Sequence, residues 1–467
     1  MHRPAKNIKK FPDKFSQMTL SPLGPLIFRL SLPAVVANII GVVYNLTDTF
    51  YLGRIGTTTT TTAAAAAASG VVMPVMVLIQ AFGLLFGAGA GNRISVLLGK
   101  KDIEKSKQLA STAISSAFLL SCILGSLFLI FRSDIARIMG ATSGLLGMAS
   151  TYLIPLLIAS SLYCTSYAFD PILRFQGLAK ESMIGIALGA VLNIFLEPLF
   201  IFPMHLGMLG AGIATAICES LSFFLLLFLF AKKSQVPLDL KRFSFRSFGP
   251  ILSAGMPNFV RNVMGAVSTD IFNLVTDPFG AAAIAGVTIA NRILLLTASA
   301  EIGMGRGYQP VCGYNFGAHK YYRVKRGYYL ILIASAVLLI LVSILQSIFA
   351  PYLIALFRNS PPVVKYGSDF LRFFSLTFPL YSFIICSNMM QQTLGHTLIA
   401  SLVGLARQGV FLVPLLFIFP ACFGFLGLEI CQPVSDCLTF LLTVPMQILV
   451  FSDLRKAELL YSQNLQR

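Results

Sequence analysis

Charged residues are scarce in this chain of 467 residues. Asp, Glu, Lys and Arg together make up 11% of it, whereas soluble domains carry about 25%. Hydrophobic residues make up 56% and the mean hydropathy is +0.80. This shortage of charge excludes an ordinary water-soluble domain and indicates that lipid is part of the solvent of this protein.

Clustered cysteine and histidine are also missing. The eight cysteines are scattered, mostly within apolar stretches, without a CxxC pair or metal-ligand spacing to the four histidines. The same stretches contain no grouped His, Asp and Glu and no Ser/His arrangement of the kind that an enzyme embedded in the membrane needs. We therefore expect neither an enzyme nor a bound cofactor, and read the cysteines as small buried hydrophobic residues.

Long apolar runs are abundant. A helix needs about 20 apolar residues to cross the hydrocarbon, and stretches of that length recur between short polar breaks. Transmembrane β-strands would alternate in hydropathy, which 118–131 and 221–230 do not. The sequence thus predicts an all-α integral membrane protein with about twelve spans: 26–50, 67–95, 109–131, 147–170, 183–203, 207–231, 249–275, 280–308, 327–350, 366–390, 397–420 and 424–451.

The net charge of +17 comes from basic residues that fall mostly on one side of these spans. They are not gathered on one amphipathic face as in nucleic-acid-binding modules, so we expect no nucleic-acid partner. Placing 1–25, 97–107, 232–248 and 320–326 in the cytoplasm satisfies the positive-inside rule. We expect both termini in the cytoplasm, a location in the inner (plasma) membrane, and no helix before residue 25, with the first span acting as an uncleaved targeting signal.

The chain reads as two similar halves. LSLPAVVANIIGVVYNLTDTF resembles LSAGMPNFVRNVMGAVSTDIF, and LFIFPMHLGMLGAGI resembles LFIFPACFGFLGLEI. Each half has an even number of spans, so the repeats run parallel and are related by an axis along the membrane normal. We predict a cytoplasmic segment (1–25), a first six-helix bundle (26–231), a cytoplasmic linker (232–248), a second bundle (249–451) and a cytoplasmic tail (452–467), with a pseudo-twofold axis and a central cavity between bundles.

Two Gly-rich stretches, 82–91 and 301–307, favour close helix packing or motion between helices. The Thr/Ala run at 57–69 receives no role.

Few ionisable residues lie within the spans, and each is a functional candidate because charge in the bilayer is costly. Asp48 lies late in the first span, and Glu197 follows Asn193 by four residues and so shares its helical face. Pro198 frees a backbone carbonyl nearby. If Asp48 and Glu197 converge, they repel unless a proton or a cation neutralises one of them, which suits a coupling-ion site. The structural alternatives are that Asp48 pairs with Arg54 or caps a helix, and that Asp170 caps the fourth helix or pairs with Arg174.

The second half has no counterpart of the Asn193/Glu197 pair, so we expect the two halves to have different roles. Polar residues and a flexible methionine are the candidates for the walls of a substrate cavity, although methionine stripes are more often simple packing. These candidates are Tyr44, Asn45, Asp270, Asn273, Gln309, Asn388, Met389 and Gln391.

Five segments stand out along the chain: YNLTDTFYLGRIG (44–56), LRFQGLAKESM (173–183), NIFLEPLFIF (193–202), GMLGAGIATAI (207–217) and QPVCGYNFGAHKYYRVKRG (309–327). By their order and the twelve-span layout, the chain resembles the multidrug and toxic compound extrusion (MATE) family of cation-coupled efflux transporters. The GYN-x-GA segment and the carboxylate-bearing first lobe are similar to the prokaryotic DNA-damage-inducible-like branch of that family.

The resemblance implies that Asp48, Asn193, Glu197 and Thr215 form the first-lobe cation site, with Asp170 at a nearby position where asparagine is more usual. These four residues are metal ligands only if sodium is the coupling ion, and Glu197 replaces the usual aspartate, which leaves protons or sodium open. The implied activity is antiport of small organic, cationic or amphipathic compounds out of the cell by a monomer in the bilayer.

The alternative function is a flippase for lipid-linked precursors, which belongs to a sister group with two bundles. It would need a strongly cationic cavity to bind phosphate. The candidates for such a cavity are Arg29, Arg261, Arg292, Arg306, Arg372 and Arg407.

Overall fold

The computed structural model describes residues 14–466 apart from 53 and 56–58, and within these residues all regular structure is helical. The first lobe contains α1 (Lys14–Leu20), α2 (Leu23–Leu52), α3 (Thr59–Gly99), α4 (Ile103–Ile130), α5 (Arg132–Ile138), α6 (Ser143–Phe175), α7 (Ala179–Ile201) and α8 (Gly207–Lys233). The second contains α9 (Phe245–Thr276), α10 (Ala281–Gly317), α11 (Tyr321–Ala355), α12 (Pro361–Ser375), α13 (Phe378–Leu394), α14 (Thr397–Leu405), α15 (Leu412–Phe423) and α16 (Phe425–Gln466).

The predicted membrane fold is confirmed. In the described part of the chain ten helical stretches are long and apolar enough to cross a membrane, and the α12/α13 pair, bent by 51°, makes an eleventh span. The 32-residue α9 falls outside that set but is about 48 Å long, so we count it as the twelfth. Every predicted span lies within one of these helices or helix pairs, with at most two residues extending beyond its ends, although several of the helices are longer than predicted.

The chain before the first span departs from expectation. Residues 1–13 lie outside the described part, but Lys14–Leu20 forms α1 and α2 already begins at Leu23. The prediction of no helix before residue 25 is therefore wrong. The carbonyl of Met18 in α1 accepts a hydrogen bond from Asn315 Nδ2 in α10, at 3.0 Å. A short apolar helix gains its stability from such tertiary contacts, which local sequence does not reveal.

The Thr/Ala run also joins a helix. Its residues 57–58 lie outside the described part, and from Thr59 the run forms the first turns of α3.

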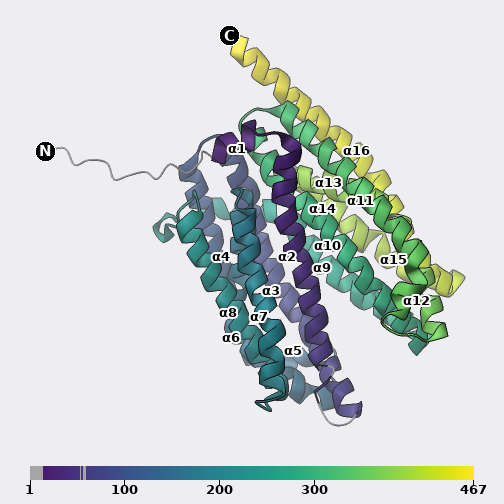
Figure 1. The fold of residues 1–467 in the computed structure, drawn as a ribbon. Helices are drawn as coiled ribbons and strands as arrows, with labels where there is room; N and C mark the ends of the chain where they lie inside the picture. Colours follow the sequence, from purple (N-terminus) through teal and green to yellow (C-terminus); the bar gives the residue numbers. More distant parts are fainter. Residues whose placement is uncertain (1–13, 53, 56–58, 467) are drawn as a thin grey trace.

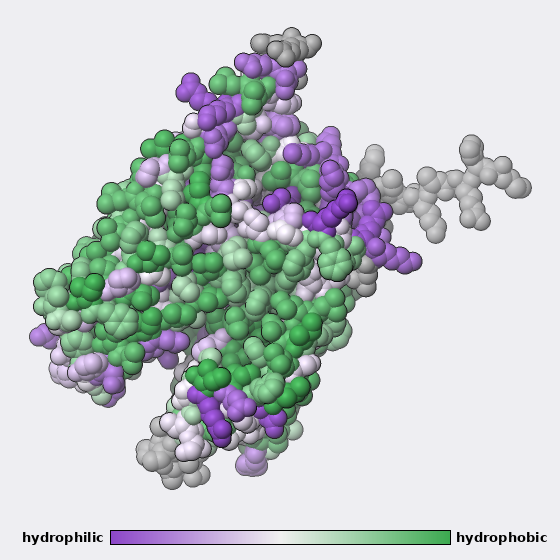
Figure 2. Space-filling model, turned by 180° about the vertical axis from the view of Figure 1, so that it is seen from behind, coloured by the Kyte–Doolittle hydropathy of each residue, from purple (hydrophilic) through white to green (hydrophobic). Residues whose placement is uncertain are grey.

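The helices form two lobes that meet at one end and part at the other. Figure 1 shows α2–α8 in one group and α9–α16 in the other, with α1 and the end of α16 at the same end of the molecule. Helix α2 packs on α10, and α3 packs on α9. Hydrophobic side chains cover most of both lobes, and a notch separates the lobes at the end opposite α1 (Figure 2). An apolar surface of this extent fits the lipid-facing belt of a membrane protein.

Local backbone geometry supports the internal repeat. Lys101 after α3 and His319 after α10 both have left-handed φ angles, 62° and 58°. In each turn the next amide closes the helix end: Asp102 N donates to Leu97 O at 2.9 Å, and Lys320 N donates to Asn315 O at 2.8 Å. The matched glycines Gly207 and Gly424 likewise have φ angles of 53° and 60°. The two halves therefore use the same turn after α3 and α10, and a left-handed glycine recurs at the start of α8 and just before α16, although the turn before α8 also has a left-handed His205.

Glycines bring the lobes into backbone contact near α1. A Cβ atom on Gly255 of α9 would overlap the carbonyl of Leu85 in α3, and one on Gly307 of α10 would overlap the backbone of Ser31 in α2. Gly99 and Gly317 face each other at the ends of α3 and α10. The Gly-rich stretch 301–307 thus serves packing between lobes, at Gly303 and Gly307 against α2. The stretch 82–91 contacts the second lobe at Gly89, whereas its other glycines pack on α6 of their own lobe.

The connection between lobes is fixed to the first lobe. Helix α8 ends at Lys233 and α9 begins at Phe245. Between them, the side-chain oxygen of Gln176 accepts hydrogen bonds from Ser234 Oγ at 2.8 Å and from Gln235 N at 2.9 Å.

Candidate functional site

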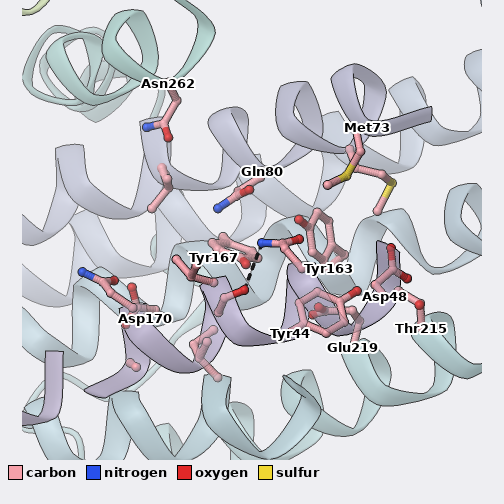
Figure 3. Close-up of a pocket in the computed structure, with 18 of the residues that line it drawn as sticks. Tyr44, Asp48, Met73, Gln80, Tyr163, Tyr167, Asp170, Thr215, Glu219 and Asn262 are labelled. Atoms are coloured by element: carbon pink, nitrogen blue, oxygen red, sulfur yellow. Dashed lines mark hydrogen bonds between the residues drawn. The ribbon is translucent and has the colours of Figure 1, made fainter. Parts of the chain in front are cut away.

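A cavity of about 350 Å³ lies between the lobes (Figure 3). Most of its wall belongs to α2, α3, α6 and α8 of the first lobe, and the second lobe adds residues of α9 and α10. Its polar and aromatic lining consists of Asn38, Tyr44, Asn45, Asp48, Gln80, Tyr152, Tyr163, Tyr167, Asp170, Thr215, Glu219, Asn262, Ser299 and Arg306. Three carboxylates and one guanidinium give this cavity an acidic balance.

Helical spacing places these side chains in the cavity. Tyr44 and Asp48 are one turn apart on α2, and Tyr163 and Tyr167 are one turn apart on α6. Thr215 and Glu219 repeat the spacing on α8. Residues four apart share a helical face, so each helix contributes a two-residue stripe. Figure 3 shows Asp48 and Thr215 together at one end of the cavity and Asp170 at the other.

Behind Asp48 and Thr215 lies a second, enclosed polar group on α7. Asn193 and Glu197 are 1% and 0% exposed and do not line the cavity. Asn193 Nδ2 donates a hydrogen bond to Thr215 Oγ1 at 3.0 Å. Asn193 Oδ1 and both carboxylate oxygens of Glu197 have no hydrogen-bond partner among the described residues. Buried polar atoms of this kind are rare in folded proteins and call for a ligand or a proton.

Asp48 connects the cavity to this enclosed group. It is 6% exposed, accepts a hydrogen bond from Tyr152 at 3.4 Å and interacts directly with the carboxyl group of Glu197. Arg54 instead lies over the ring of Phe50, with 4.2 Å between its Cζ and the centroid, and forms no ion pair with Asp48 within the described residues. Asp48, Asn193, Glu197 and Thr215 are therefore brought together.

The chemistry of this set suits a small hard cation or a proton. Two carboxylates, an amide oxygen and a hydroxyl are oxygen ligands, which Na⁺-like and other hard cations prefer. Pro198 lacks an N–H, so by helix register the carbonyl of Ile194 is left free one turn earlier. The described residues contain no group of three or more His, Cys, Asp or Glu able to hold a metal ion.

Asp170 lies apart from this set, at the other end of the cavity. Ser182 Oγ of α7 donates a hydrogen bond to Asp170 Oδ1. Arg174 is not its ion-pair partner in the described structure, since its Nη1 donates to Gln309 Oε1 of the second lobe at 3.4 Å. Asp170 is thus part of the cavity wall rather than of the Asp48 group.

The second-lobe candidates are dispersed. Asp270 and Asn273 line two other pockets, and Gln309 faces Arg174 between the lobes. Asn388, Met389 and Gln391 are buried inside the second lobe, where Asn388 Nδ2 donates to Ala400 O at 2.6 Å and Gln391 Nε2 donates to Gln447 Oε1 at 3.1 Å. Of the predicted substrate-cavity residues, Tyr44 and Asn45 line the central cavity.

Glu219 and the α6 tyrosines of the cavity were not predicted from the sequence. Glu219 is an ionisable residue in the middle of the apolar span GMLGAGIATAICESLSFFLLLFLF, four residues after Thr215. That position alone marks it as a functional candidate.

Comparison with known families decides the classification. The MatE family model matches residues 33–199 and 257–418, one segment in each lobe, and together these make up well over half of the chain. The chain belongs to the MatE family. The first matched segment contains Asp48, Asn193 and Glu197, whereas Thr215 falls between the two.

Relatives and solved structures agree with this membership. The MatE chain is 28% identical over 415 residues to the multidrug export protein MepA of Staphylococcus aureus strain MRSA252, covering 87% of this chain and 89% of MepA. It is 26% identical over 414 residues to MepA of Staphylococcus haemolyticus, with the same coverage.

Among solved structures, an outward-facing multidrug resistance MATE transporter has a TM-score of 0.85 at 25% identity, covering 95% of this chain and 99% of that one. A MATE protein in complex with MaL6 has a TM-score of 0.88 at 23% identity, covering 96% of this chain and all of that one, and shows the same fold. This MatE protein is therefore a multi-pass membrane transporter with the two-lobe fold.

Proposed function

We propose that this protein exports small organic cations by antiport, with a coupling ion bound by Asp48, Asn193, Glu197 and Thr215. The observation that carries the proposal is the set of buried oxygens on Asn193 and Glu197 that have no partner, directly behind Asp48. The name multidrug export protein of the MepA relatives supports the export of several compounds.

A cation or proton in this group changes the balance between two states of the transporter. When it is absent, the charges of Asp48 and Glu197 repel each other in a low-dielectric interior; when it is bound, the group is neutral and can contract. A ligand shifts a conformational equilibrium only by binding one state better than the other. Contraction of α2 and α7 around the ion supplies that difference, because Asp48 also lines the substrate cavity.

The distribution of basic residues supports a cytoplasmic position for both termini and hence for the closed end near α1. The notch then faces outward, and release of substrate would occur from this state. We further propose that the protein acts as a monomer in the plasma membrane, needs no organic cofactor and catalyses no chemical reaction.

The competing flippase function finds some support in the second lobe, where Arg292 and Arg407 line a cavity of about 360 Å³. Arg407, however, is already neutralised by Asp436, with 2.8 Å between Nε and Oδ1. The central cavity contains three carboxylates against Arg306, which disfavours a lipid-linked diphosphate. Efflux of cations is the better-supported function.

Transport in reconstituted liposomes tests the proposal. Efflux of the fluorescent cation ethidium is measured under an imposed sodium gradient and, separately, an imposed pH gradient, for the parent, Asp48→Asn and Glu197→Gln. We expect one of the two gradients to drive ethidium efflux by the parent, which identifies the coupling ion. We expect neither gradient to drive efflux by the variants. Gradient-driven efflux that persists in both variants would exclude this coupling site, and a parent that moves a lipid-linked diphosphate but no ethidium would favour the flippase.

A further inference from the structure

Glu219 differs from the other carboxylates of the central cavity. Asp48 accepts a hydrogen bond from Tyr152, and Asp170 accepts one from Ser182. Glu219, which is half-buried on α8 and lines the cavity, has no hydrogen bond and no ion pair with any described residue. Its charge therefore lacks a protein partner within the cavity, an arrangement that favours a ligand of opposite charge.

Aromatic rings surround this carboxylate. Tyr44, Tyr163 and Tyr167 line the same cavity as Glu219. The rings of Tyr163 and Tyr167 are edge to face with centroids 5.0 Å apart. Figure 3 shows Glu219, Tyr44, Tyr163 and Tyr167 among the side chains that line this cavity. Aromatic faces beside a carboxylate attract an organic cation, because the ring faces are themselves negative.

The wall across the cavity is adaptable and uncharged near Glu219. Met73 and Met76 of α3 and Asn262 of α9 belong to it. Methionine side chains fit ligands of different outlines, since they are flexible and polarisable. Arg306, the one guanidinium of the cavity lining, is held by Asn38, to whose Oδ1 its Nη1 donates at 2.7 Å, and it forms no ion pair with Glu219 in the described structure.

Glu219 is separate from the proposed coupling-ion group. It follows Thr215 by one turn of α8 toward the middle of the span, whereas Asn193 and Glu197 lie behind Thr215 and outside the cavity. A ligand too large to enter the buried group can therefore reach Glu219 while a proton or sodium ion occupies Asp48 and Glu197.

We infer that Glu219, together with Tyr44, Tyr163 and Tyr167, binds the positively charged group of an aromatic or quaternary-ammonium substrate, as a recognition site separate from the coupling-ion site. The inference deepens the proposed function, on which it rests: it identifies the residue that selects cations over neutral or anionic compounds. The tyrosines hold the cation by ring faces, and Glu219 supplies the full negative charge.

Direct binding tests this assignment without transport. Ethidium binding to the purified full-length protein in detergent is measured by fluorescence anisotropy for the parent, Glu219→Gln, Glu219→Asp and Glu429→Gln. Glu429 is a buried carboxylate of α16 in the other lobe, 6% exposed, and so is a matched control. We expect Glu219→Gln to weaken ethidium binding at least about tenfold, Glu219→Asp to restore part of the affinity, and Glu429→Gln to leave it unchanged.

The tyrosines need a second comparison. Tyr163→Leu and Tyr167→Leu should each weaken ethidium binding about twofold to fivefold, whereas Tyr163→Phe and Tyr167→Phe should retain it because the ring face remains. Ethidium affinity unchanged in Glu219→Gln would overturn the inference, as would a parent that does not bind ethidium. Ethidium binding that depends on Glu219 in a parent without gradient-driven efflux would support the recognition site and refute antiport, so the two failures are distinguishable.

Discussion

Asn193 and Thr215 are joined across α7 and α8 by a hydrogen bond of 3.0 Å, in which Nδ2 of the amide donates to the hydroxyl oxygen. Because the amide nitrogen is engaged, Asn193 presents its oxygen, and that atom has no partner among the described residues. The bond thereby orients an oxygen ligand beside Glu197.

Removing the hydroxyl should disturb the ion site while leaving the fold intact. In Thr215→Val the Asn193 amide loses its acceptor inside the protein, which costs about 1–3 kcal/mol. We expect the ion concentration that half-activates efflux in liposomes to rise about tenfold. Thr165→Val is the control, since that buried hydroxyl bonds only the Ser161 carbonyl of its own helix at 2.6 Å. Equal effects of both changes would remove Thr215 from the site.

Asp48 and Glu197 should act as one unit. If a single cation or proton must contact both carboxylates, losing either one removes the coupling, and the loss of both adds nothing. We expect Asp48→Asn, Glu197→Gln and the double variant to show the same residual gradient-driven efflux of ethidium. A double variant that is slower by the product of the two single effects would mean that the carboxylates work independently.

The buried carboxyl groups of Asp48 and Glu197 should also lower the thermal stability of the parent. Glu197→Gln removes a buried carboxyl group whose oxygens have no hydrogen-bond partner and which lies beside Asp48. We expect its melting temperature in detergent and sodium-free buffer to exceed that of the parent by about 2 °C or more, a gain in stability made at the expense of function. Glu458→Gln, at a half-exposed ion pair with Lys325, should give no such gain. A lower melting temperature for Glu197→Gln would show that its carboxyl group is already satisfied.

The closed end should depend on Gly255. A Cβ there would overlap the Leu85 carbonyl of the other lobe, so Gly255→Ala should push the lobes apart near α1 and lower the population of this state. We expect slower ethidium efflux and greater labelling of a cysteine introduced at Leu252 by a water-soluble maleimide, in a background lacking the native cysteines. Gly265→Ala is the control on the same helix, with nothing within 4 Å of its Cβ position. Unchanged labelling in Gly255→Ala would show that the contact can relax.

One buried ion pair should matter for stability. Arg407 Nε is 2.8 Å from Asp436 Oδ1, and Asp436 is 0% exposed. Arg407→Met leaves that carboxylate without its cation, at a cost of about 3–5 kcal/mol, which thermal denaturation in detergent should detect. Arg137→Met, which breaks an exposed pair with Asp134, should change stability by less than about 1 kcal/mol. Adding Asp436→Leu to Arg407→Met should recover part of the loss, and no recovery would show that Arg407 stabilises mainly by its packing.

Part of the candidate site was accessible from sequence. Asp48, Asn193 and Glu197 are found by asking which polar groups lie in apolar spans, and the four-residue spacing puts the last two on one face. Thr215 was predicted only from the family resemblance. A threonine within a membrane span costs too little free energy to mark it as a functional residue. Glu219 could have been found by the rule that found Glu197 and was overlooked. Gln309, Asn388 and Gln391 were predicted by the same rule to line the substrate cavity. Their polar groups instead form hydrogen bonds inside the second lobe or between the lobes.

The sequence by itself determined the membrane-spanning segments and the internal repeat, but not the short helix α1. In a membrane each span must satisfy its own backbone hydrogen bonds, so hydropathy and length suffice to place it. Only the tertiary structure decided which faces meet. The partners of Gly255, of Asn193 and of Glu219 lie on other helices, and their juxtaposition follows from packing between helices and lobes, which no local pattern encodes. For that reason Asp48 and Glu197 were predictable residue by residue, whereas the packing that places Asp48 and Glu219 in the wall of one cavity was not.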